Sequence, residues 1–268
     1  MDYMEANRLN WNDRVPIHLR KNDIYDLDAF RAGKLSFCAN EHLELTEVKG
    51  KRLLHLQCHF GLDTMSWTRL GAKAVGIDFS EEAIQIAENL KKELGLDTEF
   101  ICCNVYDVPE RIDEKFDIVF TSVGALTWLP DLEKWARVIF QMLKPGGRLY
   151  VKDSHPASEV FEYINGELKV HYPYFRGREP FRFEEDSTYT SSSKKGEIRH
   201  ATTYQWLHSF SYILNSVIQA GLQIDKILES PHGFFKRFPP MQRNEDGVWE
   251  YPGNPIPLTF TLFASKPE

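Results

Sequence analysis

Asp78 is the residue whose place in the chain points most directly to chemistry. It ends the apolar run 74–77 and precedes Phe79 and Ser80. Nucleotide-binding folds keep an acid near the end of their second strand, where the carboxylate accepts hydrogen bonds from ribose hydroxyls. The acid could instead only stabilise the amino end of the helix that follows. We expect the ribose role, which implies a ligand that contains a ribose.

The turn 57–64, Q-C-H-F-G-L-D-T, lies before Asp78 and leads from an earlier apolar run into a helix. The first N–H groups of that helix lack intrahelical partners and lie at its positive end, so an electron-rich group could dock there. His55, Cys58 and His59 cluster here, but they lack helical spacing, and no outlying Cys or His pair completes a tetrahedral set. We therefore predict a ligand-binding turn without a metal.

The elements that must position these residues alternate between short apolar runs and helical patterns from residue 51 onward. Strands are predicted at 53–56, 74–77, 100–102, 118–121 and 149–152. Ser80 and Gly95 delimit one amphipathic helix, and a second spans 131–143 and stops at K-P-G-G, residues 144–147. This order is typical of βαβ units. The sequence therefore predicts an α/β fold, a Rossmann-like, mostly parallel sheet flanked by helices.

The rest of the chain divides around this core. The sequence pattern predicts a helical lead-in at residues 1–49, and residues 50–153 are expected to form the core. Residues 154–203 are interpreted as an inserted cap after the fifth strand, with an antiparallel hairpin. Residues 204–268 complete the sheet through a helix near 205–220, closed by Gly221, and strands at 224–229 and 258–264. We expect one domain.

Residues 51–153 resemble the class I S-adenosylmethionine-dependent methyltransferases. The matching blocks are 53–63, G-I-D-F-S at 76–80, N-V-Y-D-V-P at 104–109, and F-D-I-V-F at 116–120 followed by L-K-P-G-G-R-L-Y-V at 143–151. The last pair is the most specific, because these two segments, separated by a helix, are characteristic of the family. The resemblance implies S-adenosylmethionine as the cofactor.

The resemblance also implies roles for single residues. Asp78 would bind the ribose hydroxyls and Phe79 would cover one face of the adenine. Asn104 would meet the adenine amino group, and the backbone of Val105 would face the ring nitrogens. Ser122 would lie beneath the methionine part.

The first loop departs from the family pattern of hydrophobic-Asp-hydrophobic-Gly-x-Gly-x-Gly. His55 takes the Asp place, Gln57 and His59 take two glycine places, and only Gly61 remains. The form L-H-L-Q-C-H-F-G-L-D-T is similar to the first loop of a bacterial subgroup of methyltransferase-like proteins. Glycine permits close approach and positive φ, so the two replacing side chains must point away or contact the ligand. Our hypothesis is that Gln57 and His59 contact the cofactor together with Gly61.

Asp153 and His155 follow the fifth strand, where an acceptor would approach the methyl group. They are the candidate catalytic residues, with His155 as a general base, although both could make only local hydrogen bonds. Trp11 is a candidate lid over the cofactor or an ordinary core residue. The aromatic-rich segment 171–183, with Trp206, could cap an organic acceptor or merely cover a sheet edge.

Methyl transfer to a small-molecule acceptor by in-line displacement is the predicted reaction. A non-catalytic S-adenosylmethionine-binding module is the first alternative, and the unusual loop keeps it open. An NAD-dependent oxidoreductase shares the strand, turn and acid arrangement. It would require three glycines in the first loop, where this chain has one.

Composition limits the partners. A net charge of −7 and the absence of a long Lys/Arg run disfavour nucleic acid. No apolar stretch is long enough to cross a membrane, and residues 1–10 lack a secretory pattern, so we expect a cytoplasmic protein. Four cysteines, at 38, 58, 102 and 103, are too few for a disulfide framework and are expected to be reduced.

Overall fold

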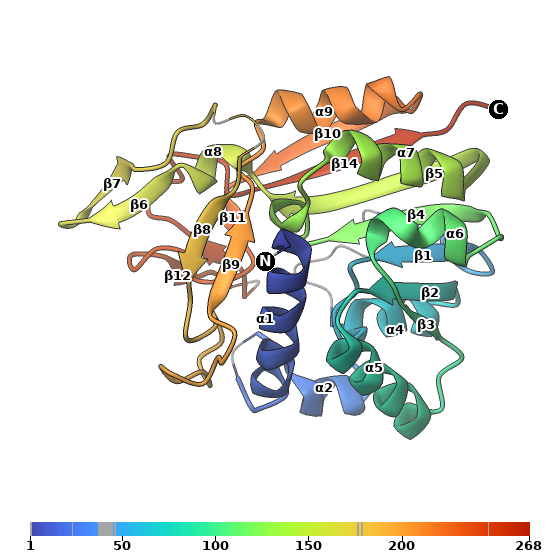
Figure 1. Ribbon diagram of the computed structural model, residues 1–268, viewed down its shortest axis with the longest axis horizontal. Helices are drawn as coiled ribbons and strands as arrows, with labels where there is room; N and C mark the ends of the chain where they lie inside the picture. Colours follow the sequence, from blue (N-terminus) through green and yellow to red (C-terminus); the bar gives the residue numbers. More distant parts are fainter. Residues whose placement is uncertain are drawn as a thin grey trace.

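The computed structural model describes residues 2–22, 24–36, 45, 47–175, 177, 179–245 and 247–268. Its centre is a seven-stranded sheet of order β10-β14-β5-β4-β1-β2-β3 (Figure 1). The strands are β1 (Arg52–Leu56), β2 (Lys73–Asp78), β3 (Glu99–Cys102), β4 (Phe116–Ser122), β5 (Leu143–Ser154), β10 (Gln223–Ser230) and β14 (Thr259–Ser265). β1 to β5 run parallel, and β14 is antiparallel to both neighbours. The predicted Rossmann-like, mostly parallel sheet is confirmed.

The predicted turn 144–147 belongs to an irregularity inside β5. Phe116 of β4 pairs with Leu143, whereas Ile118 pairs with Arg148, so the intervening residues of β5 bulge away from the ladder. Gly146 has a φ of 69°, and its N–H donates to the carbonyl of Lys266. Such an extra loop within a strand needs a residue that tolerates positive φ, which glycine does without a Cβ clash. The K-P-G-G signal therefore marks a bulge at the start of a long strand.

Helices cover both faces of the sheet (Figure 1). On one face, α7 (Leu132–Met142) and α9 (Phe210–Gln219) share a core with alternate side chains of β1, β4, β5 and β14. On the other face, α4 (Leu62–Arg69) packs Trp67 against the remaining side chains of the same strands. α5 (Glu81–Leu94) lies beside α4 through Ala83 and Leu90. A sheet covered on both faces requires strands that are apolar on both sides, as the sequence of this core is.

The helix boundaries show which local signals are reliable. Ser80 caps α5 through its side chain, and Gly95 ends it in the left-handed conformation, as predicted. The predicted helix near 205–220 begins later, at Phe210 with Ser209 as its cap. Gln205 instead ends β9 (Thr202–Gln205), because the segment pairs with β8 (Phe181–Glu184). The side chain of Ser209 accepts the N–H of Tyr212 and so sets the start of α9.

The lead-in contains α1 (Tyr3–His18) and α2 (Leu27–Arg31), and α1 packs along β9 in the centre of Figure 1. Residues 37–44 lie outside the described residues. The segment after β5 forms α8 (Pro156–Glu159) and two hairpins, β6–β7 (Phe161–Ile164, Glu167–Val170) and β8–β9. A small sheet joins β11 (His232–Gly233), β13 (Trp249–Glu250) and β12 (Gln242–Arg243). Within the described residues, no helix is long and apolar enough to cross a membrane.

The strand order reverses between β1 and β4. From β1 the chain extends the sheet through β2 and β3 on one side, then returns to β4 and β5 on the other. The loops after β1 and β4 therefore separate, and they open a crevice at the carboxyl ends of the two strands. The residues that follow these strands, Gln57 and Ser122, face that crevice.

Candidate functional site

Two adjoining cavities occupy this crevice, with volumes of about 100 Å³ and about 600 Å³. Eight of the nine predicted cofactor residues line the smaller one: Trp11, Gln57, His59, Asp78, Phe79, Asn104, Val105 and Ser122. The ninth, Gly61, lines the larger cavity. The fold thus brings together residues from the lead-in and from the ends of β1, β2, β3 and β4.

The loop after β1 keeps the backbone of a glycine-rich loop although it has lost most of the glycines. Gln57 and His59 have φ values of 57° and 52°, and Gly61 has 80°. Positive φ places the Cβ of a non-glycine residue near its own carbonyl and is unfavourable by roughly 1 kcal/mol. Two such residues in one loop indicate that their side chains make compensating contacts.

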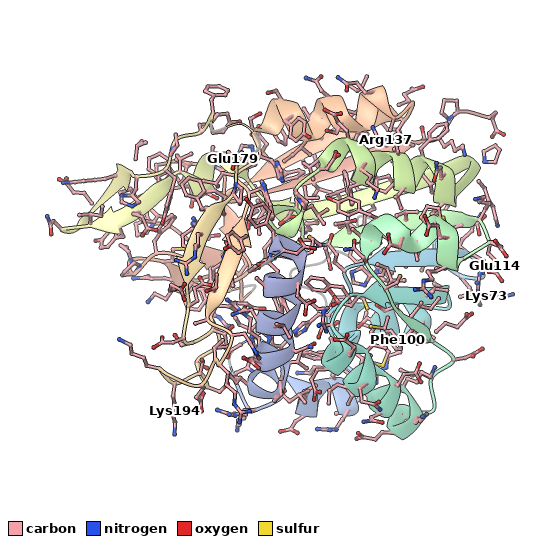
Figure 2. All side chains as sticks on the ribbon, viewed as in Figure 1. Lys73, Phe100, Glu114, Arg137, Glu179 and Lys194 are labelled. Carbon is pink, nitrogen blue, oxygen red and sulfur yellow. The ribbon has the colours of Figure 1, made fainter. Side chains whose placement is uncertain are left out.

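A side chain is not tolerated at Gly61, although Gln57 and His59 stand at two other glycine places of the family pattern. A Cβ at this position would lie 2.4 Å from the Phe100 ring, besides the strain of its positive φ. Phe100 lies on β3 and is labelled in Figure 2. It packs with residues of α4 and α5. The glycine is therefore required by packing inside the fold as well as by the turn.

The Gln57 amide reaches across the crevice. Its Nε2 donates to the carbonyl of Ala125, 3.0 Å away, and so ties the β1 loop to the β4 loop. Its Oε1 is buried and has no hydrogen-bond partner among the described residues. A buried acceptor left without a donor costs about 1–3 kcal/mol, so a ligand donor at this atom would be favoured.

Asp78 lies at the bottom of the smaller cavity and is 7% exposed. Its Oδ2 accepts the backbone N–H of His59 at 2.8 Å, and its Oδ1 accepts that of Ser80 at 2.9 Å. Burial raises the pKa of this carboxyl to about 6, although the backbone donors oppose the shift. Each oxygen retains a second lone pair, so the carboxylate can accept two hydroxyl donors.

The residues after β3 form the other wall of the smaller cavity. Asn104 precedes the short 3₁₀ helix η1 (Val105–Asp107) and accepts the N–H of Tyr106 at its Oδ1, 3.0 Å away. This bond leaves the amide nitrogen of Asn104 as the donor for a ligand. Phe79 and Val105 add apolar surface to the same cavity. A flat heterocycle with hydrogen-bonding edges fits this set.

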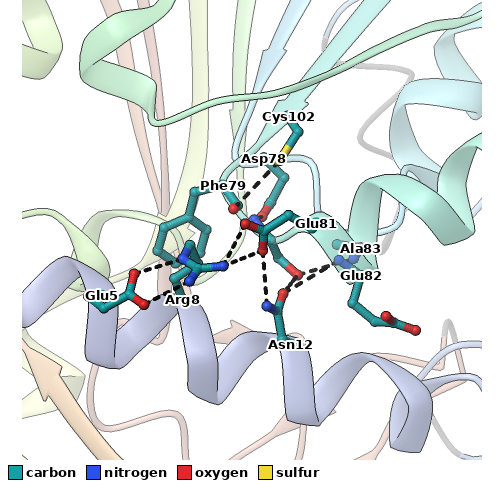
Figure 3. A network of polar contacts seen from close by, with 10 residues as sticks. Glu5, Arg8, Asn12, Asp78, Phe79, Glu81, Glu82, Ala83 and Cys102 are labelled. Atoms are coloured by element: carbon teal, nitrogen blue, oxygen red, sulfur yellow. Dashed lines mark hydrogen bonds and ion pairs between the residues drawn. The ribbon is translucent and has the colours of Figure 1, made fainter.

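The lead-in helix α1 is fixed to this wall by a polar network (Figure 3). Arg8 pairs with Glu5 and Glu81, and the Asn12 amide oxygen accepts the Ser80 hydroxyl at 2.6 Å. These contacts join α1 to the amino end of α5, directly beside Asp78 and Phe79. Helix α1 therefore forms part of the wall of the site.

Trp11 of α1 projects into both cavities. Its ring lies 5.3 Å from the His59 ring and 5.2 Å from the Trp128 ring, edge to face in each case. The Arg14 guanidinium lies over Trp11 and Trp128, at 5.3 and 5.7 Å from the ring centroids. Trp11 thus lies at the cavity wall, as the lid hypothesis requires.

Ser122, at the end of β4, belongs to a chain of side-chain hydrogen bonds. His55 Nδ1 lies 2.8 Å from the Thr64 hydroxyl, and its Nε2 lies 2.9 Å from Ser122 Oγ. Ser122 in turn donates to Asp63 Oδ2 at 3.3 Å. Burial lowers the pKa of His55 to about 3, so the ring is neutral, with its proton on Nε2 if Ser122 donates to Asp63.

Asp153 organises the loop after β4. Its two oxygens accept the backbone N–H groups of Gly124, Ala125, Leu126 and Ser154 at 2.5 to 3.1 Å. Burial raises its pKa to about 6. Four backbone donors occupy the lone pairs of the carboxylate, so Asp153 positions a loop that lines the site, and a catalytic role for it stays a prediction.

His155 points away from both cavities. Its ring packs against Phe210 and Phe260, its Nδ1 accepts the N–H of Ala157, and its Nε2 lies 2.9 Å from the Glu229 carboxylate. The geometry therefore does not support the expected general base. His155 lies beyond the end of β5, where it caps α8, and the turn of the chain there brings its ring against α9 and β14.

The site includes residues that the sequence analysis missed. Tyr25, Tyr189 and Trp128 line both cavities, and His208 lines the larger one. The pair after Ser122, Val123 and Gly124, could have been found, because residues at the carboxyl end of a central strand belong to such sites. Tyr25 and Tyr189 carry no such signal, because they arrive from the lead-in and the insertion.

Metal ligation is not supported where the chain is described, since no group of three His, Cys, Asp or Glu residues there is arranged to hold an ion. Cys58, Cys102 and Cys103 are free thiols, and Cys38 lies outside the described residues. Cys102 is exposed at the end of the edge strand β3.

Comparison with known proteins shows which class of protein the chain is similar to. Residues 54–151 match the family model of a methyltransferase domain. The ubiquinone biosynthesis O-methyltransferase of Pseudomonas fluorescens (strain SBW25) is 29% identical over 126 residues, which cover 46% of this chain and 54% of that protein. The chain thus matches about half the length of this curated relative.

Solved structures agree in fold. An S-adenosylmethionine-dependent methyltransferase from Mesorhizobium loti has a TM-score of 0.58 and 18% identity, covering 89% of this chain and 96% of that one. A methyltransferase of the same description from Methanosarcina mazei has a TM-score of 0.55 and 17% identity, covering 86% and 99%. Residues 54–151 are thus similar to a methyltransferase domain, and the chain shares the fold of S-adenosylmethionine-dependent methyltransferases, whose cofactor is S-adenosylmethionine.

Proposed function

We propose that the protein transfers the methyl group of S-adenosylmethionine to a small organic molecule held in the larger cavity. The observation that supports this most strongly is the shared wall of the two cavities, to which Gln57, His59 and Ser122 belong. A nucleoside in the smaller cavity and an acceptor in the larger one would meet there.

The smaller cavity fits the adenosine part of the cofactor. Asp78 offers its remaining lone pairs to the ribose hydroxyls. Phe79 and Val105 supply apolar surface for the adenine, and the Asn104 amide offers a donor to its edge. Gln57 Oε1, buried and without a donor, is satisfied when a ligand N–H or O–H approaches it. Gly61 contributes indirectly, because its positive φ permits the turn that positions the loop after β1.

When bound, S-adenosylmethionine supplies an electrophilic methyl group on a sulfonium sulfur. The chain has to align the acceptor with that group and exclude water, which accounts for a large share of the rate in such displacements. The Gln57–Ala125 hydrogen bond and the four N–H bonds to Asp153 fix the loops on either side of the shared wall. We therefore assign the chain a positioning mechanism, without a base at His155 or Asp153.

Aromatic side chains from four parts of the chain line the larger cavity, which favours a planar or ring-containing acceptor. They include Trp11, Tyr25, Phe30, Phe60, Trp128, Tyr189, Trp206, Phe234 and Phe235. The curated relatives are named for O-methylation in ubiquinone biosynthesis. A hydroxyl on an aromatic ring is accordingly the first acceptor to test.

Calorimetry followed by turnover tests the proposal. S-adenosylmethionine and S-adenosylhomocysteine should bind, whereas NAD should not. Incubation with S-adenosylmethionine and a panel of phenols, amines and thiols should yield a product heavier by one methylene, detected by mass spectrometry. Binding of NAD alone would refute the proposal. Cofactor binding with no turnover on any acceptor would favour the non-catalytic module.

A further inference from the structure

The carboxylate that the family places on β1 is missing here, because His55 occupies its position. His55 is neutral and uses both ring nitrogens within the protein, toward Thr64 and Ser122. A neutral ring so engaged cannot receive a cationic group of a ligand. The methionine end of the cofactor carries an ammonium, which needs an acceptor of opposite charge when it leaves water.

Six described carboxylates line the two cavities: Asp26, Asp63, Asp78, Asp153, Glu159 and Glu185. Two of them are paired with arginines, since Glu159 binds Arg237 at 2.8 Å and Glu185 binds Arg14. A carboxylate that already has a cation partner gains little from a second one.

Three others are held by the backbone. Asp153 accepts four N–H groups, and Asp78 accepts two at the ribose end of the smaller cavity. Asp26 caps α2 through the N–H of Ala29 and is exposed. None of these three is placed to receive the methionine end near Ser122.

Asp63 differs from all five. It lies in the first turn of α4, at the wall of the larger cavity, and it accepts hydrogen bonds from two hydroxyls, those of Ser36 and Ser122. The structure gives it neither a backbone donor nor an ion pair among the described residues. Burial raises its pKa, although the hydrogen bonds from Ser36 and Ser122 oppose the shift.

The connection between Asp63 and His55 is direct. Ser122 Oγ lies 2.9 Å from His55 Nε2 and 3.3 Å from Asp63 Oδ2, so the two side chains flank one hydroxyl. His55 also lines the larger cavity. A carboxylate at position 55 and a carboxylate at position 63 would therefore face the same space beside Ser122.

We propose that α4 supplies the carboxylate of this site in place of β1, and that Asp63 on α4 receives the ammonium group of the cofactor. Ser36 and Ser122 orient the Asp63 carboxylate, and the neutral His55 ring holds Ser122 in the donating orientation. The proposal rests on the proposed function, because it takes S-adenosylmethionine as the ligand. It explains why the loop tolerates a histidine in place of the family acid.

The test measures binding of S-adenosylhomocysteine by calorimetry, and compares it with an analogue that lacks the amino group but keeps the carboxylate. Asp63→Asn preserves shape and removes the charge. We expect it to weaken S-adenosylhomocysteine about 10- to 100-fold, because a desolvated charge pair is lost. The deaminated analogue should bind the variant and the wild type equally. Asp28→Asn, on exposed α2 nearby, removes a charge outside the cavity and should change neither affinity.

A reciprocal exchange tests the relocation itself. His55→Asp combined with Asp63→Asn returns the acid to β1 and should recover most of the lost affinity for S-adenosylhomocysteine. Equal binding of S-adenosylhomocysteine to Asp63→Asn and wild type would overturn the inference, as would equal weakening of both ligands. Failure of the wild type to bind S-adenosylhomocysteine would instead overturn the proposed function.

Discussion

Nε2 of His59 lies 3.2 Å from Nδ1 of His18, and Nε2 of His18 lies 2.8 Å from the Thr188 hydroxyl. One chain of polar contacts thus joins the loop after β1 to the lead-in helix and to the insertion. Burial lowers the pKa of His59 to about 3 and that of His18 to about 2. Both rings are therefore neutral near pH 7, and the N–H of one ring donates a hydrogen bond to the bare nitrogen of the other.

Replacement of His59 by glycine separates the two roles of this residue. The change relieves the strain of a φ of 52°, but it removes the ring that contacts Trp11, Tyr25 and His18. We expect the affinity for S-adenosylhomocysteine to fall about tenfold, by the loss of roughly 1.4 kcal/mol of contact at the cavity wall. Calorimetry on His59→Gly measures this directly.

His18→Ala is the matched control, because it breaks the histidine pair and leaves the His59 ring in place. It should weaken binding less than His59→Gly does. Unchanged affinity in His59→Gly would contradict a direct contact between His59 and the cofactor.

Stability should fall when the pH drops below about 6.5. The pKa values of His18, His55, His59 and His208 are lowered by burial to about 2, 3, 3 and 4, from an ordinary value of 6.5. Below pH 6.5 the unfolded chain binds protons that the native state does not bind, so each histidine contributes a loss of about 1.4 kcal/mol per pH unit. This stability is complete above pH 6.5 and decreases as the pH falls.

Two acids oppose this trend at lower pH. Burial raises the pKa of Asp78 and Asp153 from 3.8 to about 6, so between pH 6 and 4 the native state binds their protons first. The two acids offset about two of the four histidine protons, so the net loss should level off at roughly two protons, about 2.8 kcal/mol per pH unit, between pH 6 and pH 4. Urea unfolding across this range measures how the free energy of unfolding depends on pH. His55→Gln should reduce the slope of this dependence by about one proton. Stability that does not change between pH 7 and pH 5 would contradict the buried, neutral histidines.

Local signals in the sequence predicted much of the core. Ser80 and Gly95 predicted both ends of α5 correctly, and the apolar runs predicted the five parallel strands. Asp78 was placed correctly at the crevice because its position follows from strand order, which the βαβ rhythm already implies. His155 caps α8 just past the end of β5, and the strand pattern alone does not show that the chain turns there.

Contacts between segments far apart in the chain could not be predicted in the same way. Tyr25 and Tyr189 meet at the cavity wall, where their hydroxyls lie 2.6 Å apart. Neither residue follows a strand or belongs to a repeated pattern, and their proximity depends on how α1 and the β8–β9 hairpin pack together. Such packing is decided by the sum of many weak contacts, which a single sequence does not display.

Gly61→Ala should destabilise the protein more than glycine-to-alanine changes elsewhere. The new Cβ would meet the Phe100 ring at 2.4 Å and would also adopt a φ of 80°. We expect a loss of about 2–4 kcal/mol, of which roughly 1 comes from the backbone and the rest from overpacking. Gly95→Ala shares the positive φ but has open space around its Cβ, so it should show the backbone part alone. Equal losses in the two variants, measured by urea unfolding, would argue against the Phe100 clash.

Asp153→Asn and His155→Asn should differ sharply in methyl transfer. The backbone N–H groups of residues 124–126 donate to the Asp153 carboxylate, and an amide at this position would face them with its own N–H donors. The loop 124–126 should therefore lose its order, and the turnover rate should fall at least tenfold. His155→Asn retains a helix-capping side chain outside both cavities and should leave the turnover rate within about twofold. Initial rates on the same acceptor decide the matter. A large loss in His155→Asn alone would restore His155 as a catalytic residue.

Phe235→Ala should separate the two ligands of the site. Phe235 lines the larger cavity but not the smaller one, and its ring lies 5.9 Å from that of Tyr189. Its removal takes apolar surface away from the acceptor alone, so KM for the acceptor should rise about 5- to 30-fold, as expected for about 1–2 kcal/mol of lost contact. The affinity for S-adenosylhomocysteine should stay the same, because no part of the smaller cavity changes. If the variant binds S-adenosylhomocysteine weakly and keeps its KM for the acceptor, the assignment of the two cavities is reversed.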